Sequence, residues 1–171
     1  MKKVLLTIII IWTIIFFSFS TTAQERPGHS DQFFLDMGYQ SGIGDFASDY
    51  YNMQLTYGRY RTPLLFYGVG STFRLNQLSD DKIVGAFINT KSRLIPKYEP
   101  LLIDIGIGYN YQLDRDFTDG GILFFAGIQN ETQIDENLKF HFGVSYDVMR
   151  IIRFGELFLY RSYNAKIGIS F

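Results

Sequence analysis

The amino-acid sequence predicts an all-β protein in which eight antiparallel strands close into an up-and-down barrel. Three observations lead to this prediction. Apolar and polar residues alternate in segments of about ten residues, which is the side-chain period of a β-strand. Breaks rich in Gly, Pro, Asn and Asp, the residues that turns require, separate these segments. A sustained helical period is found nowhere in the segments themselves.

The start of the chain is expected to be removed before the protein folds. Lys2 and Lys3 form a basic start, residues 4–19 are almost wholly apolar, and residues 20–23 are small enough for cleavage before Gln24. This is the outline of a secretory signal peptide. An uncleaved anchor is the alternative, but the apolar run is shorter than the roughly 20 residues of a spanning helix. We therefore predict a signal peptide at 1–23, a short leader at 24–31 and one domain at 32–171.

The expected strands follow one another through this domain. In chain order they are 32–41, 52–61, 63–75, 82–92, 98–113, 121–131, 138–150 and 156–171. Antiparallel strands joined by short breaks form a meander, and eight strands suffice to close a small barrel.

The segments differ in how clearly they alternate. From Ile103 to Leu113 every second residue is Ile, Tyr or Leu, and the residues between are Asp, Gly, Asn and Gln. The first three segments and the last two alternate in the same way. Segments 82–92 and 121–131 have apolar residues on both faces, so each fits either a packed interior cluster or a two-sided soluble core, and their register stays open.

The composition of the polar face predicts which side is outside. A solvated face normally carries many Lys and Glu residues, whereas this one is dominated by Gly, Ser, Thr, Asn and Gln. Its few titratable residues are Asp36, Arg74, Asp104, Lys139, His141, Asp147 and Lys166. Repeated glycine, which weakens a strand, indicates a crowded inner wall. We therefore expect the polar face inside and the apolar face toward lipid, as in a transmembrane β-barrel. The alternative is a soluble lipocalin-like barrel or β-sandwich with its apolar face inward.

Charge and cysteine content exclude several classes of function. The net charge of −1 and the lack of a basic stripe argue against nucleic-acid binding. The chain has no cysteine, which excludes a disulfide framework, a thiolate nucleophile, a cysteine metal site and acylation at an N-terminal cysteine. Aromatic residues make up 18% of the chain, and the expected places for them are interfacial girdles at the ends of the strands. Candidates for these girdles are Tyr39, Tyr57, Tyr109, Tyr111 and Tyr163.

The last segment carries a family resemblance. Residues 163–171 (YNAKIGISF) alternate up to a final Phe171. This resembles the closing strand of bacterial outer-membrane barrels, which commonly ends in an aromatic residue that the barrel-assembly machinery reads. Together with the signal peptide and the eight segments, the mature chain resembles the small outer-membrane barrels of the OmpX and OmpA type.

The resemblance implies a location and an orientation. The protein would lie in the outer membrane of a Gram-negative-type bacterium with both termini in the periplasm. Extracellular loops would lie near 41–51, 76–82, 114–121 and 151–156, and periplasmic turns near 61–63, 92–100 and 130–137. Two of these expected turns, 92–100 and 130–137, are as long as some of the expected loops.

The residues for catalysis or metal binding are incomplete. Ser145 is four residues along the strand from His141, about 13 Å away and too far for direct contact. Lipid A deacylases carry a serine two residues after the catalytic histidine, where this chain has Gly143. A cross-strand Ser162 or Ser170 keeps a lipid-modifying enzyme open as an alternative. Residues 114–121 superficially resemble a calcium loop through Asp114, Asp116 and Asp119, but Phe125 stands where the late glutamate ligand is expected. We assign no catalytic, cofactor-binding or metal-binding residue.

These observations favour a structural or surface-interaction role through the extracellular loops. Side chains fill the bore of an eight-stranded barrel, so a general diffusion pore is not expected, and the inward charges are expected to pair as a polar plug. A narrow channel and an enzyme acting on lipid A or phospholipid acyl chains are the alternatives. Expected partners are outer-membrane lipids, the barrel-assembly machinery and an extracellular ligand or surface that meets Phe46, Tyr50, Phe117 or Phe154. The alternative for these four aromatics is that they fold back onto the barrel rim. We expect a monomer.

Overall fold

The computed structural model describes residues 31–44, 48–76, 81–93, 100–113, 120–153 and 156–171. Eight β-strands make up nearly all of them. They are β1 (Asp31–Ile43), β2 (Tyr50–Thr62), β3 (Leu65–Asn76), β4 (Lys82–Arg93), β5 (Leu101–Gln112), β6 (Gly120–Asp135), β7 (Leu138–Arg153) and β8 (Glu156–Ser170). The described residues include no helix long and apolar enough to cross a membrane. The expected signal peptide and most of the expected leader lie outside the described residues.

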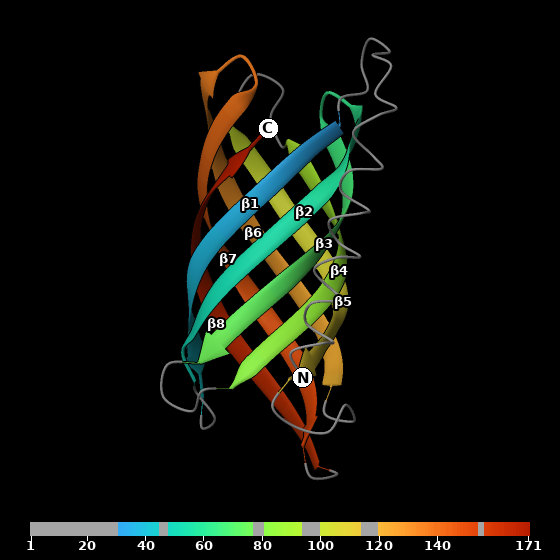
Figure 1. The fold of residues 1–171 in the computed structure, drawn as a ribbon, viewed down its shortest axis with the longest axis vertical. Helices are drawn as coiled ribbons and strands as arrows, with labels where there is room; N and C mark the ends of the chain where they lie inside the picture. Colours follow the sequence, from blue (N-terminus) through green and yellow to red (C-terminus); the bar gives the residue numbers. More distant parts are fainter. Residues whose placement is uncertain (1–30, 45–47, 77–80, 94–99, 114–119, 154–155) are drawn as a thin grey trace, which may run out of the picture.

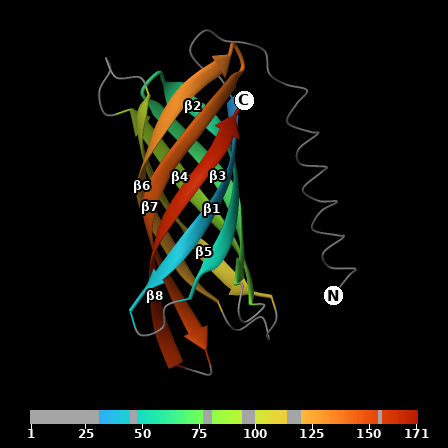
Figure 2. The same ribbon diagram turned by 90° about the vertical axis from the view of Figure 1, so that its left-hand side faces the viewer.

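The strands form one closed antiparallel barrel in sequence order (Figures 1 and 2). The first and last strands close it, with pairs that run from Phe34 and Ser170 to Ile43 and Arg161. Two backbone hydrogen bonds between Phe33 and Phe171, of 2.8 and 3.0 Å, extend this seam to the last residue of the chain. The predicted fold class is therefore confirmed.

The two ends of the barrel differ in their connections. The terminal end holds the start of β1, the end of β8 and the connections β2–β3, β4–β5 and β6–β7. The loop end holds the other four connections. At the terminal end β6 continues to Asp135, which pairs with Leu138, so only residues 136 and 137 form the turn. The expected turn at 130–137 was wrong in length, and most of it is strand. The two-residue β6–β7 turn is as short as the turns expected on the periplasmic side.

Several strands are longer at the loop end than the sequence predicts. β1 continues to Ile43, β2 begins at Tyr50, and β7 continues to Arg153. The last residues of β7 pair only with β8, from Arg150 with Leu159 to Arg153 with Glu156. Figure 1 shows this β7–β8 hairpin projecting beyond the neighbouring strands. The expected break at 151–156 therefore lies partly within strand.

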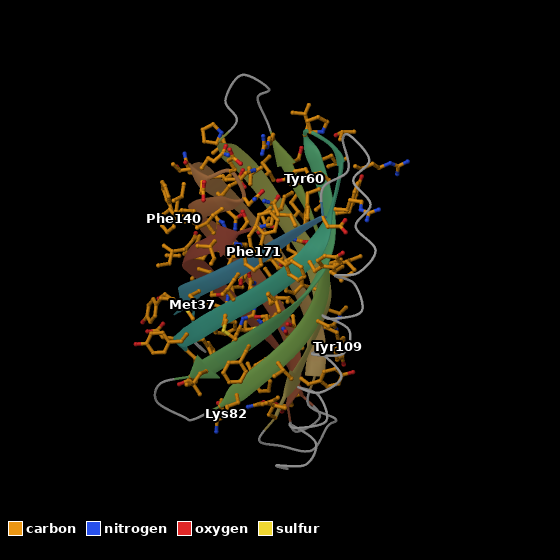
Figure 3. The ribbon with its side chains drawn as sticks, turned by 45° about the horizontal axis from the view of Figure 1, so that its top comes forward. Met37, Tyr60, Lys82, Tyr109, Phe140 and Phe171 are labelled. Carbon is orange, nitrogen blue, oxygen red and sulfur yellow. The ribbon has the colours of Figure 1, made fainter. Side chains whose placement is uncertain are left out.

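The two faces of the wall are assigned as predicted. Outward residues such as Met37 are exposed, with 57% of its surface accessible, and Figure 3 shows Met37 and Tyr109 pointing away from the barrel. Inward residues such as Asp36 and Arg74 are buried. A soluble barrel would show the reverse arrangement, since apolar side chains leave water on folding.

The two segments of open register also resolve. Ile83 and Phe87 of β4, and Leu123 and Phe125 of β6, are buried inside the barrel. Their outward neighbours, such as Ile88 and Ile122, are apolar as well. These two strands are therefore apolar on both faces because one face meets a packed interior cluster.

Glycines opposite this cluster make room for its rings. A Cβ atom on Gly106 would overlap the ring of Phe125, and one on Gly70 would overlap the ring of Phe87. The two rings themselves meet edge to face at 5.2 Å. A glycine on the inner wall is therefore the complement of an inward phenylalanine.

Candidate functional site

The lumen is divided into three layers along the barrel axis. At the terminal end Phe34, Tyr60 and Phe66 form a small apolar cluster. The larger loop-end cluster comprises Tyr50, Ile83, Phe87, Leu123, Phe125, Met149 and Tyr160. Buried polar and charged side chains fill the space between. Large rings thus occupy the bore at both ends of a polar middle layer.

Asp104 is the centre of this middle layer. Its Oδ2 accepts hydrogen bonds from Lys91 Nζ at 3.0 Å and from Lys166 Nζ at 2.8 Å, while Oδ1 accepts one from Asn89 at 3.0 Å. Lys91 also donates to the Gln129 amide oxygen at 2.8 Å. Burial disfavours an isolated charge strongly, and the two cations beside this carboxylate offset that cost.

The ammonium groups in turn lie against the apolar clusters. Lys91 Nζ is 4.5 Å from the ring centroid of Phe34, and Lys166 Nζ is 5.5 Å from that of Phe125. These distances are within the range of a cation–π interaction. The charged layer and both apolar layers are therefore packed as one unit.

A second pair joins β1 to β7. His141 Nε2 lies 2.6 Å from Asp36 Oδ1, and both side chains are buried. The serines that would make this histidine catalytic are engaged elsewhere. Ser162 accepts a hydrogen bond from Gln40, and Ser170 accepts one from Gln32. No hydrogen bond joins a serine to His141 within the described residues, and acyl transfer requires a nucleophile within hydrogen-bond reach of its base.

The third pair lies nearer the loop end. Arg74 is fully buried, and its Nη2 is 3.4 Å from Asp147 Oδ2. Ser145 donates to the other oxygen of Asp147 at 2.7 Å, and Arg74 Nη1 donates to Asn110 at 3.3 Å. Ser145 therefore serves this ion pair.

A fourth cluster lies near the terminal end. Glu131 Oε1 accepts from Arg93 at 3.1 Å and from Lys139 at 2.9 Å. The lumen thus pairs all seven titratable residues that the sequence assigned to it. Sequence reasoning missed Lys91 and Glu131, because they belong to the segments of open register. The sequence did hold one sign of this. Ile83, Phe87 and Lys91 are four positions apart, so they lie on the same face of the strand.

Tyr50 corrects one expectation about the extracellular loops. It was expected either to be exposed in a loop or to fold back onto the barrel rim, and it is buried inside the barrel, where it meets the ring of Tyr160 edge to face at 5.5 Å. The Tyr160 hydroxyl donates to the backbone carbonyl of Ser48. Tyr50 is three positions before the outward Met53, and side chains an odd number of positions apart lie on opposite faces of a strand. Tyr50 therefore belongs to the inner wall. Phe46, Phe117 and Phe154 lie outside the described residues.

A short clasp holds β1 to the residue before β2 on the outer side. Asp49 accepts a hydrogen bond from the Tyr39 hydroxyl at 2.7 Å and another from the backbone N–H of Gly42 at 3.3 Å. The hydrogen bond from Tyr39 lowers the pKa of the Asp49 carboxyl below its ordinary value. Asp49 therefore stays ionised as it fastens this corner.

Metal ligands do not cluster in the part of the chain that the structure describes. No group of three or more His, Asp or Glu side chains is placed there to hold an ion. The calcium-like residues Asp114, Asp116 and Asp119 lie outside the described residues.

Comparison with solved structures places this fold among known ones. Neisserial surface protein A superposes with a TM-score of 0.60 and 15% identity, covering 84% of this chain and 97% of that one. The N-terminal barrel domain of Pseudomonas aeruginosa OprF gives 0.52 and 9%, covering 84% and 99%. The Yersinia pestis outer membrane protein Ail gives 0.51 and 13%, covering 83% and 100%.

This is the fold of the small eight-stranded outer-membrane barrels. No family model matches the chain, and no curated protein matches it by sequence. The likeness is thus one of architecture.

Aromatic pairs near both ends of the wall suit a small outer-membrane barrel. Toward the loop end the ring centroids of Tyr39 and Tyr51 are 5.9 Å apart and those of Tyr146 and Tyr163 are 5.6 Å apart. At the terminal end Phe33 stacks on Phe171 at 5.7 Å. Such rings occupy the two interfaces of a bilayer.

Proposed function

We propose that this protein resides in the outer membrane and has a structural or surface-interaction role carried by its loop end. The observation that carries the proposal is the inversion of the wall, with apolar residues exposed around the outside and charges buried within. An apolar belt of this kind is stable only against hydrocarbon. The terminal end would face the periplasm and the loop end the medium.

The filled lumen supports a role that does not depend on transport. Ring clusters occupy both ends of the bore, and ion pairs occupy the middle. A solute would have to displace packed side chains and leave buried charges without partners. The projecting β7–β8 hairpin offers a surface outside the bilayer for contact with another molecule.

Single-cysteine labelling tests the placement directly, because the natural chain contains no cysteine. Leu159 lies in the β7–β8 hairpin at the loop end, and Arg61 lies at the terminal end. Both side chains are exposed, and each would be replaced by cysteine in a separate variant. A maleimide that cannot cross the outer membrane should label Leu159→Cys on intact cells and Arg61→Cys only after lysis. The reverse result would invert the orientation, and labelling of neither on intact cells would refute surface exposure.

Shortening the hairpin separates the structural role from the interaction role. Residues 151–158 would be replaced by Asn-Gly, which connects two antiparallel strands tightly. Cells lacking the protein would be supplied with either the native or the shortened form. They would then be tested for sensitivity to detergent and for adherence to a coated surface. A purely structural protein should be fully replaced by the shortened form. A surface-interaction protein should recover detergent resistance without recovering adherence.

A further inference from the structure

The outer wall carries a feature that the lumen and the loops do not explain. A groove with a volume of about 830 Å³ crosses the outside of the barrel from β5 to β2. Its floor includes Ala165, which pairs with Val144 on one side and Tyr39 on the other. Phe142, Ile167 and Met37, which lie in the neighbouring row, line one side of the groove. A small side chain between larger ones makes the surface hollow here.

Two arginines face outward above this groove, toward the loop end. Arg150 of β7 pairs with Leu159, and Arg161 of β8 pairs with Val148, so the two arginines are diagonal neighbours on one face. Diagonal neighbours lie about 7–8 Å apart, which long side chains span. Neither forms an ion pair with a described residue. The carboxylate of Asp49, directly before β2, is held by Tyr39 and Gly42.

The order of side chains along β8 matches that of an anchored lipid. From the loop end, the outward residues are Arg161, then Tyr163, then Ala165 in the groove. Four residues separate Arg161 from Ala165, a distance of about 13 Å along the strand. The cationic side chain therefore lies nearer the loop end than the apolar groove, with one tyrosine between them. A phosphorylated headgroup lies in the same way nearer the membrane surface than its acyl chains.

We propose that this surface binds an outer-leaflet glycolipid of the lipid A type, through a phosphate at Arg150 and Arg161 and acyl chain in the groove. Adjacent like charges repel each other, and a phosphate between them removes that repulsion while accepting bidentate hydrogen bonds. A groove that crosses several strands suits a lipid with several chains better than one with two. The inference rests on the proposed membrane placement, which the cysteine labelling tests separately.

Lipid retention on the purified protein tests the site. The mature protein would be refolded in detergent, mixed with hexa-acylated bisphosphorylated lipid A, and examined by native mass spectrometry. The double variant R150Q/R161Q should bind roughly tenfold less tightly or worse, because hydrogen bonds to charged groups are lost. R61Q removes an exposed arginine at the opposite end and is the matched control, with unchanged retention expected. Equal retention by the native protein and the double variant overturns the proposal.

A second pair of variants tests the groove. A165W fills it with an outward side chain and should lower retention of lipid A severalfold, because a filled groove excludes the acyl chain. V69W adds the same bulk to an exposed position on β3 and should leave retention unchanged. A uniform effect of both variants overturns the assignment of the groove.

Three competing occupants give distinct results. Dephosphorylated lipid A should be retained as weakly by the native protein as intact lipid A is by R150Q/R161Q. Phosphatidylglycerol should be retained less than lipid A, and equal retention overturns the choice of lipid. A dimer that A165W dissociates would identify a second copy of the chain as the occupant and also overturn the proposal.

Discussion

Two residues three positions apart on β5 show how differently the two walls of this barrel are solvated. Ile107 faces outward and is 51% exposed, whereas Asp104 faces inward and is 1% exposed. In a water-soluble protein the isoleucine would be buried and the aspartate solvated. The comparison teaches that the solvent outside this wall is apolar and that the lumen supplies its own counter-charges.

Breaking the lumen should have the largest effect. Asp104→Asn leaves the ammonium groups of Lys91 and Lys166 buried beside each other without a carboxylate. Removing one partner of a buried ion pair costs about 3–5 kcal/mol of unfolding free energy. Urea unfolding in lipid vesicles, followed by tyrosine fluorescence or by gel mobility before and after boiling, measures this loss.

The matched control removes the whole cluster. The variant K91M/D104L/K166M replaces all three charges with apolar groups of similar size, and such replacements are often neutral or stabilising. We expect it to be far more stable than Asp104→Asn. If Asp104→Asn loses less than about 1 kcal/mol, water reaches the middle layer and the lumen is not sealed.

Breaking the outer wall should have the next largest effect. Ile107→Lys places a cation on the lipid side, next to Ile88 and Phe124, near the middle of the strand. A lysine near the bilayer midplane costs about 2–4 kcal/mol, but about 0–1 near an interface. Ile134→Lys is the matched control, since Ile134 is 61% exposed on the β6–β7 hairpin at the terminal end. Equal, small losses for both variants would remove Ile107 from the hydrocarbon.

The next smaller effect concerns the packing of Gly106 against the Phe125 ring on the inner wall. Gly106→Ala should lower stability by about 1–3 kcal/mol, because the new Cβ overlaps the Phe125 ring. Phe125→Leu alone also destabilises, but in the double variant the smaller side chain makes room for the methyl group. The combined loss should therefore be less than the sum of the two single losses. Additive losses would show that the two residues do not compete for space.

The sequence was sufficient for the strand count and for both faces of the clearest strands. The alternation around Asp104 and Ile107 assigns one residue to each wall, because the side-chain period of a strand is two. The choice of polar-inside followed from what the polar face lacks, namely the lysines and glutamates of a solvated surface. Closure of the barrel then followed from the bilayer, which leaves no sheet edge unpaired.

The sequence was insufficient where a partner lies on another strand. Lys91 contacts Asp104 and Gln129 only because register brings three strands together, and β4 alone gives no sign of that register. The cluster of Phe87 and Phe125 was foreseen as a possibility but could not be located. The length of β6 was misjudged because its polar end at 130–135 reads as a turn. Those residues are strand because they pair with β7 beyond the neighbouring turns.

The smallest expected effect concerns the clasp between Tyr39 and Asp49 on the outer side of the barrel. The pKa of Asp49 is lower in the folded protein than in the unfolded chain, so the unfolded chain binds a proton first as the pH falls. The clasp therefore contributes stability above the unfolded pKa, and this contribution is lost as the pH falls through the folded pKa. Tyr39→Phe removes the donor and should lower the urea midpoint slightly at neutral pH. The gap between native protein and variant should narrow as the pH falls below the unfolded pKa of Asp49, whereas a gap independent of pH would assign the loss to the tyrosine's packing rather than to the carboxylate.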